Sequence, residues 1–308
     1  MILLTGATGF VGGNLLKEML NQGFKVRCLV RNPSKAEAIK QAGVELVQGD
    51  VTDRDSIAKA LEDGKVEAAV HLVGILAETK NTTFKVIHTE GTRNMVEACK
   101  QKNVKRFIHI SALGTRENAR SEYHKTKWEA EEIIRHSGLE YTIFRPSVLF
   151  GKEDKFANLF ANIIKISPFI MIPGNGKNKM QTVSVKDLVK AMTMAINPHT
   201  NDFGVGVKDS KHINKVYEIA GPEKLAFNKI IDTICRVLGR TRLKIHIPMS
   251  LMRPGALIAE CIFPKPPITR DQLLMLEEDN ITENNALESI FGIKPVGFEE
   301  GIKGYLAT

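Results

Sequence analysis

A serine, a tyrosine and a lysine are the residues of this chain best suited by type and spacing to move a proton. In the segment SEYHKTKWEAEEII, Tyr123 and Lys127 stand four positions apart, so a helix places both on one face. Lowering the pKa of a tyrosine from about 10 to neutrality costs about 4 kcal/mol. One ammonium about 4 Å away contributes about 4 kcal/mol at an effective dielectric constant of about 20. We therefore expect Lys127 to lower the pKa of Tyr123.

Ser111 strengthens this interpretation, because Tyr-x-x-x-Lys alone also arises as an ordinary solvated pair on a helix of a lysine-rich chain. The serine ends the apolar run FIHIS, upstream of Tyr123. Open parallel sheets bind their ligands at the carboxyl ends of their strands, which is where this serine stands. The three residues are therefore candidates for one catalytic site.

Three glycines in LLTGATGFVG predict a loop that binds the diphosphate of a dinucleotide. Gly6, Gly9 and Gly12 follow an apolar strand and open a helix. The first glycine permits a tight turn, the second lets the backbone approach a pyrophosphate, and the third allows the helix to pack closely on the strand. Free N–H groups at the start of the helix then face the anion. The alternative is a glycine-rich turn that binds no ligand.

The end of the second strand favours NADP(H) over NAD(H). Proteins that bind NAD usually carry an acid there, which holds the ribose 2′-hydroxyl. Here the strand ends in LVRNPSK, with no acid between Lys25 and Glu37. Arg31, with Lys35 nearby, suits the 2′-phosphate of NADP(H) through charge-assisted hydrogen bonds. The alternative is that Arg31 is simply solvated.

The loop spacing TGxxGxxG resembles that of the extended and atypical short-chain dehydrogenases/reductases, and Ser111, Tyr123 and Lys127 match the Ser, Tyr, Lys arrangement of that family. The resemblance implies an NADP(H)-dependent oxidoreductase or an enzyme of the nucleotide-sugar epimerase/dehydratase type. In such an enzyme Ser111 orients a carbonyl or hydroxyl of the substrate, and Tyr123 exchanges the proton. Lys127 binds the nicotinamide ribose and depresses the tyrosine pKa. The substrate itself stays unknown.

The same resemblance implies which residues line the cofactor. Asp50 in QGDVTD would flank the adenine, the segment HLVG would run beneath the adenosine ribose, and FRPSVLFG would pass the nicotinamide. The expected cofactor-binding residues are Gly6, Thr8, Gly9, Phe10, Val11, Gly12, Arg31, Asp50, Val51, Leu72, Val73, Gly74, Lys127, Pro146, Ser147 and Val148. Asp53, and with it Asp50, has the alternative role of capping the next helix.

Two features separate this chain from the catalytic members. Where many extended members carry an asparagine in the helix HTEGTRNMVEA, this chain has His88, which either substitutes for it or packs. The segment VLFGKEDKFANLFA resembles the atypical branch that contains the NAD(P)H-binding accessory subunit of mitochondrial complex I and its bacterial relatives. That branch implies the alternative function, a non-catalytic NADPH-binding accessory, assembly or redox-sensing protein.

From residue 1 to about 150, short β-branched apolar runs alternate with longer helical patterns. This alternation predicts an α/β fold, a Rossmann-type doubly wound parallel sheet with a smaller, interleaved C-terminal lobe. Residues 1–150 form the expected NADP-binding core, with returns to the sheet at 180–197 and 216–221, and residues 151–308 form the substrate or partner lobe. The expected strands are MILLTG, KVRCLV, ELVQG, AAVHLVG, RFIHIS and YTIFRP. The expected helices are 14–22, 34–42, 53–62, 83–102, 122–137 and 155–165.

Composition excludes several classes of protein. The net charge is +8, but the densest basic run, KQKNVKR, ends a predicted helix, so we expect no nucleic-acid partner. The four cysteines are far apart and no histidine has ligand spacing, so neither disulfides nor a metal site is expected. No apolar stretch is long enough to span a membrane, and Met1 leads directly into the first strand without a leader, which favours the cytoplasm. A homodimer and docking to a larger complex both stay open.

Overall fold

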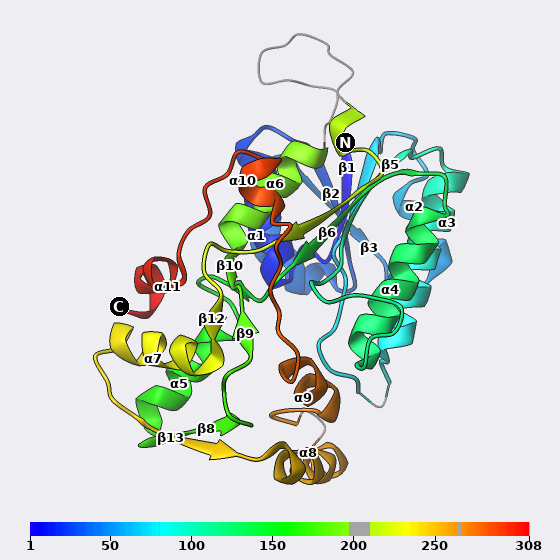
Figure 1. Cartoon of the computed structure of the whole chain (residues 1–308). Helices are drawn as coiled ribbons and strands as arrows, with labels where there is room; N and C mark the ends of the chain where they lie inside the picture. Colours follow the sequence, from blue (N-terminus) through cyan, green and yellow to red (C-terminus); the bar gives the residue numbers. More distant parts are fainter. Residues whose placement is uncertain (80, 197–209, 264–265, 308) are drawn as a thin grey trace.

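The computed structural model describes residues 1–79, 81–196, 210–263 and 266–307, and its centre is a parallel sheet of seven strands (Figure 1). The strand order is β11-β6-β5-β4-β1-β2-β3. The strands are β1 (Ile2–Thr5), β2 (Val26–Val30), β3 (Val44–Gln48), β4 (Ala68–His71), β5 (Arg106–Ile110), β6 (Glu140–Pro146) and β11 (Lys215–Ile219). Every residue of β1, β2, β4 and β5 is buried, because helices cover both faces. The doubly wound parallel sheet predicted from the sequence is confirmed.

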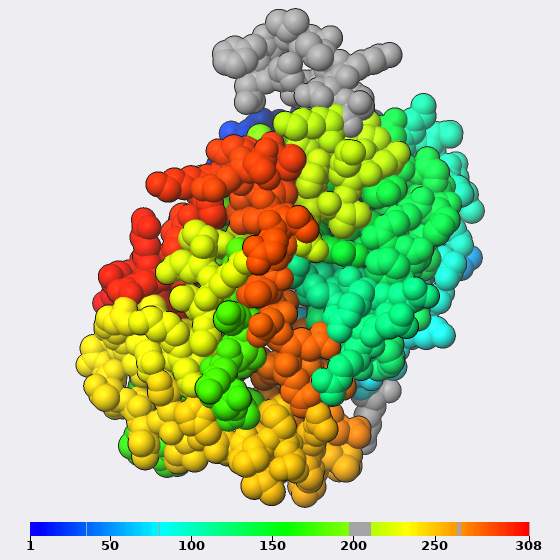
Figure 2. Space-filling model, viewed as in Figure 1, coloured from blue at the N-terminus to red at the C-terminus, as the bar shows by residue number. Residues whose placement is uncertain are grey.

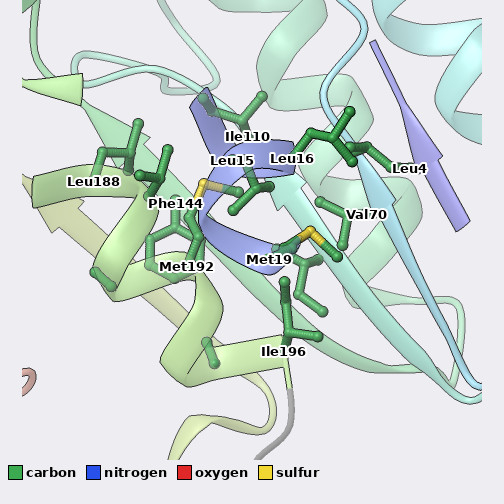
Figure 3. Close-up of a cluster of buried hydrophobic side chains, with 14 of the residues drawn as sticks. Leu4, Leu15, Leu16, Met19, Val70, Ile110, Phe144, Leu188, Met192 and Ile196 are labelled. Carbon is green, nitrogen blue, oxygen red and sulfur yellow. The ribbon is translucent and has the colours of Figure 1, made fainter. Parts of the chain in front are cut away.

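Two layers of helices bury the two faces of this sheet. Alternation along β1 sends Leu4 to one apolar cluster and Leu3 to the other. The first cluster contains Leu15 and Met19 of α1 (Phe10–Asn21) and Leu188 and Met192 of α6 (Val185–Ile196), as Figure 3 shows. The second cluster is closed by three helices. They are α2 (Arg54–Ala60), α3 (Gly91–Gln101) and α4 (Glu122–Arg135).

The second lobe is built from short elements around its own core. A cluster of Phe150, Ile170, Phe227, Ile230 and Phe298 holds it together. Its helices are α5 (Ala157–Ile166), α7 (Phe227–Val237), α8 (Met249–Ile262), α9 (Arg270–Leu276) and α11 (Phe298–Leu306), whereas α10 (Ala286–Ser289) packs on the first lobe. Three strand pairs complete it, namely β7 (Leu149–Phe150) with β10 (Val183–Ser184), β9 (Lys179–Met180) with β12 (Leu225–Ala226), and β8 (Phe169–Pro173) with β13 (Leu243–Ile247).

The lobes are interleaved, because segments after residue 150 return to the first one. β11 pairs with β6 in parallel, and Leu287 and Phe291, from α10 and the turn after it, join the α1 and α6 side of the main core. The strand expected within 180–197 is different, since β10 pairs with β7 and stays outside the main sheet. Of the segment 180–197, only the helix α6 packs on the main sheet.

Three predicted helices differ from the structure in geometry or by more than two residues at one end. The helix expected at 34–42 is instead the 3₁₀ helix η1 (Pro33–Ile39), in which Ala36 is the buried side chain. The helix expected at 83–102 begins with the π-helical turn η2 (Lys85–Glu90) and continues as α3. The helix expected at 14–22 begins earlier, at Phe10. Gly12 and Gly13 hid its first turn, because glycine is a poor helix former.

Membrane-spanning helices were also sought in the described part of the chain. Every helix there is too short or too polar to cross a bilayer.

Candidate functional site

The strand order reverses between β1 and β4, and the predicted site residues lie along the carboxyl edge on both sides of that point. From one end of the sheet to the other, the edge is formed by the segments after β3, β2, β1, β4, β5 and β6. In the same order, they carry Asp50 and Val51, Arg31, the loop from Gly6 to Gly12, Leu72 to Gly74, Ser111, and Pro146 to Val148. Residues that are far apart in the sequence are thus aligned along one edge.

The loop between β1 and α1 has the form that a diphosphate requires. Gly6 has a φ of +79°, and its carbonyl oxygen accepts a hydrogen bond from the N–H of Gly9 (3.0 Å). A Cβ on Gly12 would lie 2.0 Å from the Gly6 oxygen, so only glycine lets α1 pack this closely. No side chain caps α1, and its first turn holds no acid. Thr8 and Gly9 are exposed, which leaves the N–H groups at the start of the helix accessible to an anion.

The next strand ends flank this loop. Thr5 pairs with Leu29, so the exposed Arg31 lies just beyond the level of Gly6 on the neighbouring strand. The Asp50 carboxylate accepts hydrogen bonds from the N–H and the hydroxyl of Thr52, both at 2.9 Å. It therefore shapes the turn after β3, and the helix cap is Asp53, which accepts the N–H of Asp55.

The segment after β4 brings the loop and the predicted catalytic lysine together. A Cβ on Gly6 would lie 3.1 Å from the carbonyl carbon of Leu72, so the two strand ends are in close contact. A Cβ on Gly74 would lie 3.2 Å from the Nζ of Lys127. On the other side of the loop, Gly151, which follows β7, is packed against the ring of Phe10, whose Cζ would lie 3.2 Å from a Cβ there.

Ser111 and Lys127 are both buried at the carboxyl end of β5. The Ser111 hydroxyl donates to that of Thr115 (3.3 Å), and the Lys127 ammonium donates to the carbonyl oxygen of Ile110 (3.0 Å). Burial lowers the pKa of Lys127 to about 8, against the opposing effect of Glu131. Within the described residues, no hydrogen bond joins Ser111, Tyr123 and Lys127 to one another.

Tyr123 is enclosed by three other rings. Phe84, His88 and His124 contact it edge-on, with ring centroids 5.8, 5.4 and 5.3 Å away, and only 8% of the tyrosine is exposed. Burial raises the pKa of Tyr123 to about 12. The predicted lowering of this pKa by Lys127 is therefore wrong for the structure. The ammonium is itself buried and donates to the Ile110 backbone, so burial of the phenol dominates.

His88 packs as a neutral side chain, which decides between its two interpretations. The N–H of Ile75 donates to its Nε2 (3.1 Å), so the proton is on Nδ1, which donates to the hydroxyl of Thr126 (3.0 Å). Burial, with the nearby Lys127 ammonium, lowers the pKa of His88 to about 2. His88 thus ties the segment after β4 to the helix that carries Tyr123.

Two further histidines lie beneath the site, and the sequence did not single them out. His71 shares a hydrogen bond with the hydroxyl of Thr5 (2.8 Å) and stacks on His109, with ring centroids 5.4 Å apart. Burial lowers the pKa of His71 to about 3 and that of His109 well below its usual value, and Lys127 acts in the same direction. Both rings are therefore neutral near pH 7.

A segment of the second lobe, Thr269–Asn280, closes over the site, and we call it the closing segment. The carboxylate of Asp271 accepts the N–H groups of Glu122 and Tyr123 at 2.7 and 3.2 Å. Gln272 donates to the carbonyl oxygen of Leu76 (3.1 Å). Two ion pairs reinforce these contacts, Arg116 with Glu278 (2.8 Å) and Arg120 with Glu277 (3.0 Å).

The far end of the closing segment covers the predicted nicotinamide edge. Asn280 accepts a hydrogen bond from the hydroxyl of Ser147 and donates to the carbonyl oxygen of Leu113 (3.0 Å). Pro146 is the last residue of β6, and its carbonyl oxygen accepts from the N–H of Leu113 (2.9 Å). The carbonyl oxygen of Val148 accepts a hydrogen bond from the N–H of Val183 (3.0 Å). The residues expected to line the nicotinamide are thus engaged with other parts of the protein.

Sequence reasoning missed the closing segment, although one signal was present. Thr269 and Gln272 form a capping box that starts α9, and the pattern Thr-x-x-Gln indicates such a helix start. Nothing local indicated that Asp271 and Asn280 reach across to the first lobe. Two surface hollows of about 430 and 420 Å³ lie elsewhere, between α3 and α4 and at the amino ends of the strands.

Comparisons with known proteins agree with this geometry. The model of a family described as NAD(P)H-binding matches residues 6–164. The NADH-ubiquinone oxidoreductase 40 kDa subunit of Neurospora crassa is 25% identical over 98% of this chain and 78% of its own. The photosystem II assembly factor Ycf39 of Cyanophora paradoxa is 31% identical over 47% of this chain and 44% of its own. The predicted resemblance to the complex I subunit branch is confirmed.

A solved structure shares the fold. The UDP-glucose 4-epimerase of Thermus thermophilus in complex with NAD superposes with a TM-score of 0.73 at 17% identity, over 99% of this chain and 97% of its own. At this identity the likeness concerns the fold alone. It agrees with a sheet order that places a dinucleotide at the carboxyl ends of β1 and β4.

The first prediction tests the close packing of the loop. Replacing Gly12→Ala should lower the free energy of unfolding by about 1 to 3 kcal/mol, because the new methyl group collides with the Gly6 backbone. Gly13→Ala is the matched control, since its Cβ would lie 3.6 Å from the nearest atom, the Ala7 oxygen. Denaturant unfolding measures both variants. Equal effects of the two substitutions would contradict the packing argument.

The second prediction concerns acid. The folded pKa of His88 lies below its unfolded value of 6.5, so the unfolded chain binds the extra proton and stability falls as pH drops from 6.5 towards about 2. His88→Asn should therefore reduce the slope of stability against pH by about 1.4 kcal/mol per pH unit in this range. His136→Asn, at an exposed position, should leave the slope unchanged. Unfolding in urea at a series of pH values gives the slopes, and identical slopes for all three proteins would refute the assignment.

Proposed function

The chain belongs to the NAD(P)H-binding family whose model covers residues 6–164, and from that premise we propose that it is an NADP(H)-binding protein of the accessory or assembly type. The observation that carries this proposal is the enclosure of Tyr123. A tyrosine that is 8% exposed, with its pKa raised to about 12, is a poor partner for proton exchange at neutral pH. Nucleotide binding then stabilises the fold rather than starting a reaction.

The loop fits a dinucleotide by its own chemistry. Gly6, Gly9 and the uncapped start of α1 would hold the diphosphate, and Gly74 and Lys127 would lie beside a ribose. When bound, the nicotinamide supplies the hydride for any redox chemistry. The chain's own residues bind and orient the nucleotide, and the closing segment excludes water from the buried serine, tyrosine and lysine.

Arg31 supports NADP(H) as the preferred form. Its side chain is exposed beside the loop, one residue after β2, and no acid stands at that strand tip. A guanidinium binds a phosphate through paired charge-assisted hydrogen bonds, whereas a ribose 2′-hydroxyl favours a carboxylate.

The relatives give this proposal its partner class. They include a subunit of a respiratory oxidoreductase and an assembly factor of a photosystem, by their names. We infer that this chain also acts by docking to a larger protein complex. The nucleotide then reports or stabilises the docked form, as in a redox-sensing protein.

A second candidate function rests on a separate observation. Ser111, Tyr123 and Lys127 lie together near the carboxyl end of β5, as they do in the catalytic members that the chain resembles. An NADP(H)-dependent oxidoreductase or epimerase-type enzyme would use Tyr123 as its acid and base. It would require release of the closing segment, because Asp271 and Asn280 hold that segment over the site.

The third prediction tests the preference for NADP(H). Arg31→Ala should weaken NADPH binding about tenfold to a hundredfold, since charge-assisted hydrogen bonds contribute about 1.5 to 3 kcal/mol. NADH binding should change little. Calorimetric titration of both nucleotides measures this, with Arg236→Ala on α7 as the control for loss of an exposed arginine. Equal affinity of the wild type for both nucleotides would overturn the phosphate assignment.

The fourth prediction separates the two candidate functions. Under the accessory function, wild type and Tyr123→Phe bind NADPH alike, and neither turns over any compound of a panel of carbonyl compounds and nucleotide sugars. Absorbance of NADPH follows the carbonyl compounds, and chromatography follows the sugars. Turnover by the wild type that Tyr123→Phe abolishes, with NADPH affinity kept, would establish the enzyme and refute the accessory function.

A further inference from the structure

Exposed large apolar side chains are concentrated in one part of the second lobe. Among the described residues, most of them belong to α5, β8, β13, α8 and their immediate flanks. We call the following set the apolar surface: Ile166, Phe169, Met171, Leu243, Ile245, Leu251, Leu257, Ile258, Ile262 and Phe263, each at least 41% exposed. A group of exposed apolar side chains of this size is typical of a surface that binds another protein, a ligand or a membrane.

The strand part of this surface is one face of a ribbon. Leu243 pairs with Phe169 and Ile245 pairs with Met171, so these four side chains project to the same side of β8 and β13. On the opposite side, Ile170 is buried in the core of the lobe. The ribbon therefore has apolar side chains on both faces, one packed on the core of the lobe and the other exposed to solvent.

The helical part continues from it. β13 ends at Ile247 and α8 begins at Met249, and the two follow one another along the lower edge of the molecule (Figure 1). Leu251, Ile258 and Ile262 stand at intervals of seven and four, so they form one stripe of α8. Ala256 is the only buried residue of this helix. Figure 2 shows the atoms of α8 along the lower edge of the molecule.

The two segments that carry this surface are basic, although the rest of the second lobe is acidic. Residues 155–180 and 227–270 contain twelve lysines and arginines but only two acids, a net charge of +10. Since the whole chain has a net charge of +8, the remainder carries −2. Exposed Lys165 precedes Ile166, and exposed Arg240 lies just before β13. Neither forms an ion pair within the described part of the lobe.

We propose that the apolar surface binds to one side of an anionic lipid membrane. Exposed leucines and isoleucines on a short helix, next to lysines and arginines, are the features of a protein that lies in the membrane interface. α8 has fourteen residues and an internal Pro254, so it lies on a bilayer rather than crossing it.

The mixture of residues favours lipid over a protein partner. Protein interfaces are depleted of lysine at their centres, whereas here the exposed Lys165 stands directly beside the exposed Ile166. Lysine stems lie along apolar surface while their ammonium groups reach anionic headgroups. The apolar side chains then enter the headgroup region, and the exposed Lys165 and Arg240, which form no ion pair among the described residues, supply the attraction.

The fifth prediction tests this surface with lipid vesicles. The full-length protein should float with vesicles that contain phosphatidylglycerol and should remain in solution with vesicles of phosphatidylcholine alone. Salt should weaken binding, because the attraction is partly electrostatic. Cys261 is exposed on α8 while Cys28, Cys99 and Cys235 are buried, so an environment-sensitive dye on Cys261 should report entry into the bilayer.

Two sets of variants locate the contact, and each has a matched control. Leu251→Ser with Ile258→Ser and Ile262→Ser should reduce binding at least tenfold, whereas Leu76→Ser with Met194→Ser, which are exposed elsewhere on the protein, should not. Lys165→Glu with Arg240→Glu should also reduce binding at least tenfold, whereas Lys100→Glu with Lys102→Glu should not. All these side chains are exposed, so the fold should persist.

The opposite results would overturn the proposal. These are no flotation with anionic vesicles, equal flotation with neutral ones, or equal effects of the control variants. A wild type that dimerises in sedimentation through Leu251 and Ile258, without binding vesicles, would assign the surface to a second copy instead. NADPH titration of the same variants should be unchanged, so failure here is distinguishable from failure of the nucleotide site.

Discussion

The absence of a side chain at Gly12 is the constraint on which the rest of the site depends. Because a Cβ there would lie 2.0 Å from the Gly6 oxygen, α1 can begin directly on the end of β1. The N–H groups of its first turn then lie at the carboxyl edge of the sheet, without a capping side chain between them and a ligand. If this edge binds a phosphate group, the same nucleotide can also contact Arg31, Gly74 and Lys127.

The sequence was sufficient where the cause of a structure is local. Strand runs, the glycine loop and the Tyr123 helix follow from periodicity and from backbone sterics, and each lies where it was predicted. The enclosure of Tyr123 could not be predicted, because the rings of Phe84 and His88 reach it from a different helical segment. The predicted direction of the pKa shift of Tyr123 was wrong for the same reason. A pair of residues predicts an attraction, but only tertiary packing shows how much water each has lost.

The groups around Lys127 limit the free-energy cost of burying its charge. His71, His88 and His109 are each held neutral, so the lysine is the only cation among them. Its ammonium is compensated by the Ile110 carbonyl, and Glu131 lies on the same helix. A buried charge that is paired with dipoles and neutral rings is a site prepared for polar ligands, whichever of the two functions it serves.

The interleaving of the lobes has a consequence for biosynthesis. β11 forms the outermost strand beside β6, and Phe291 packs against Phe144 with ring centroids 5.9 Å apart. A nascent polypeptide that has emerged only through β6 therefore presents that strand as an unprotected edge, with part of its core uncovered. Completion of the sheet must wait until residues 215–219 have been made, more than two thirds of the way along the chain, so the incomplete sheet exposes this edge during synthesis.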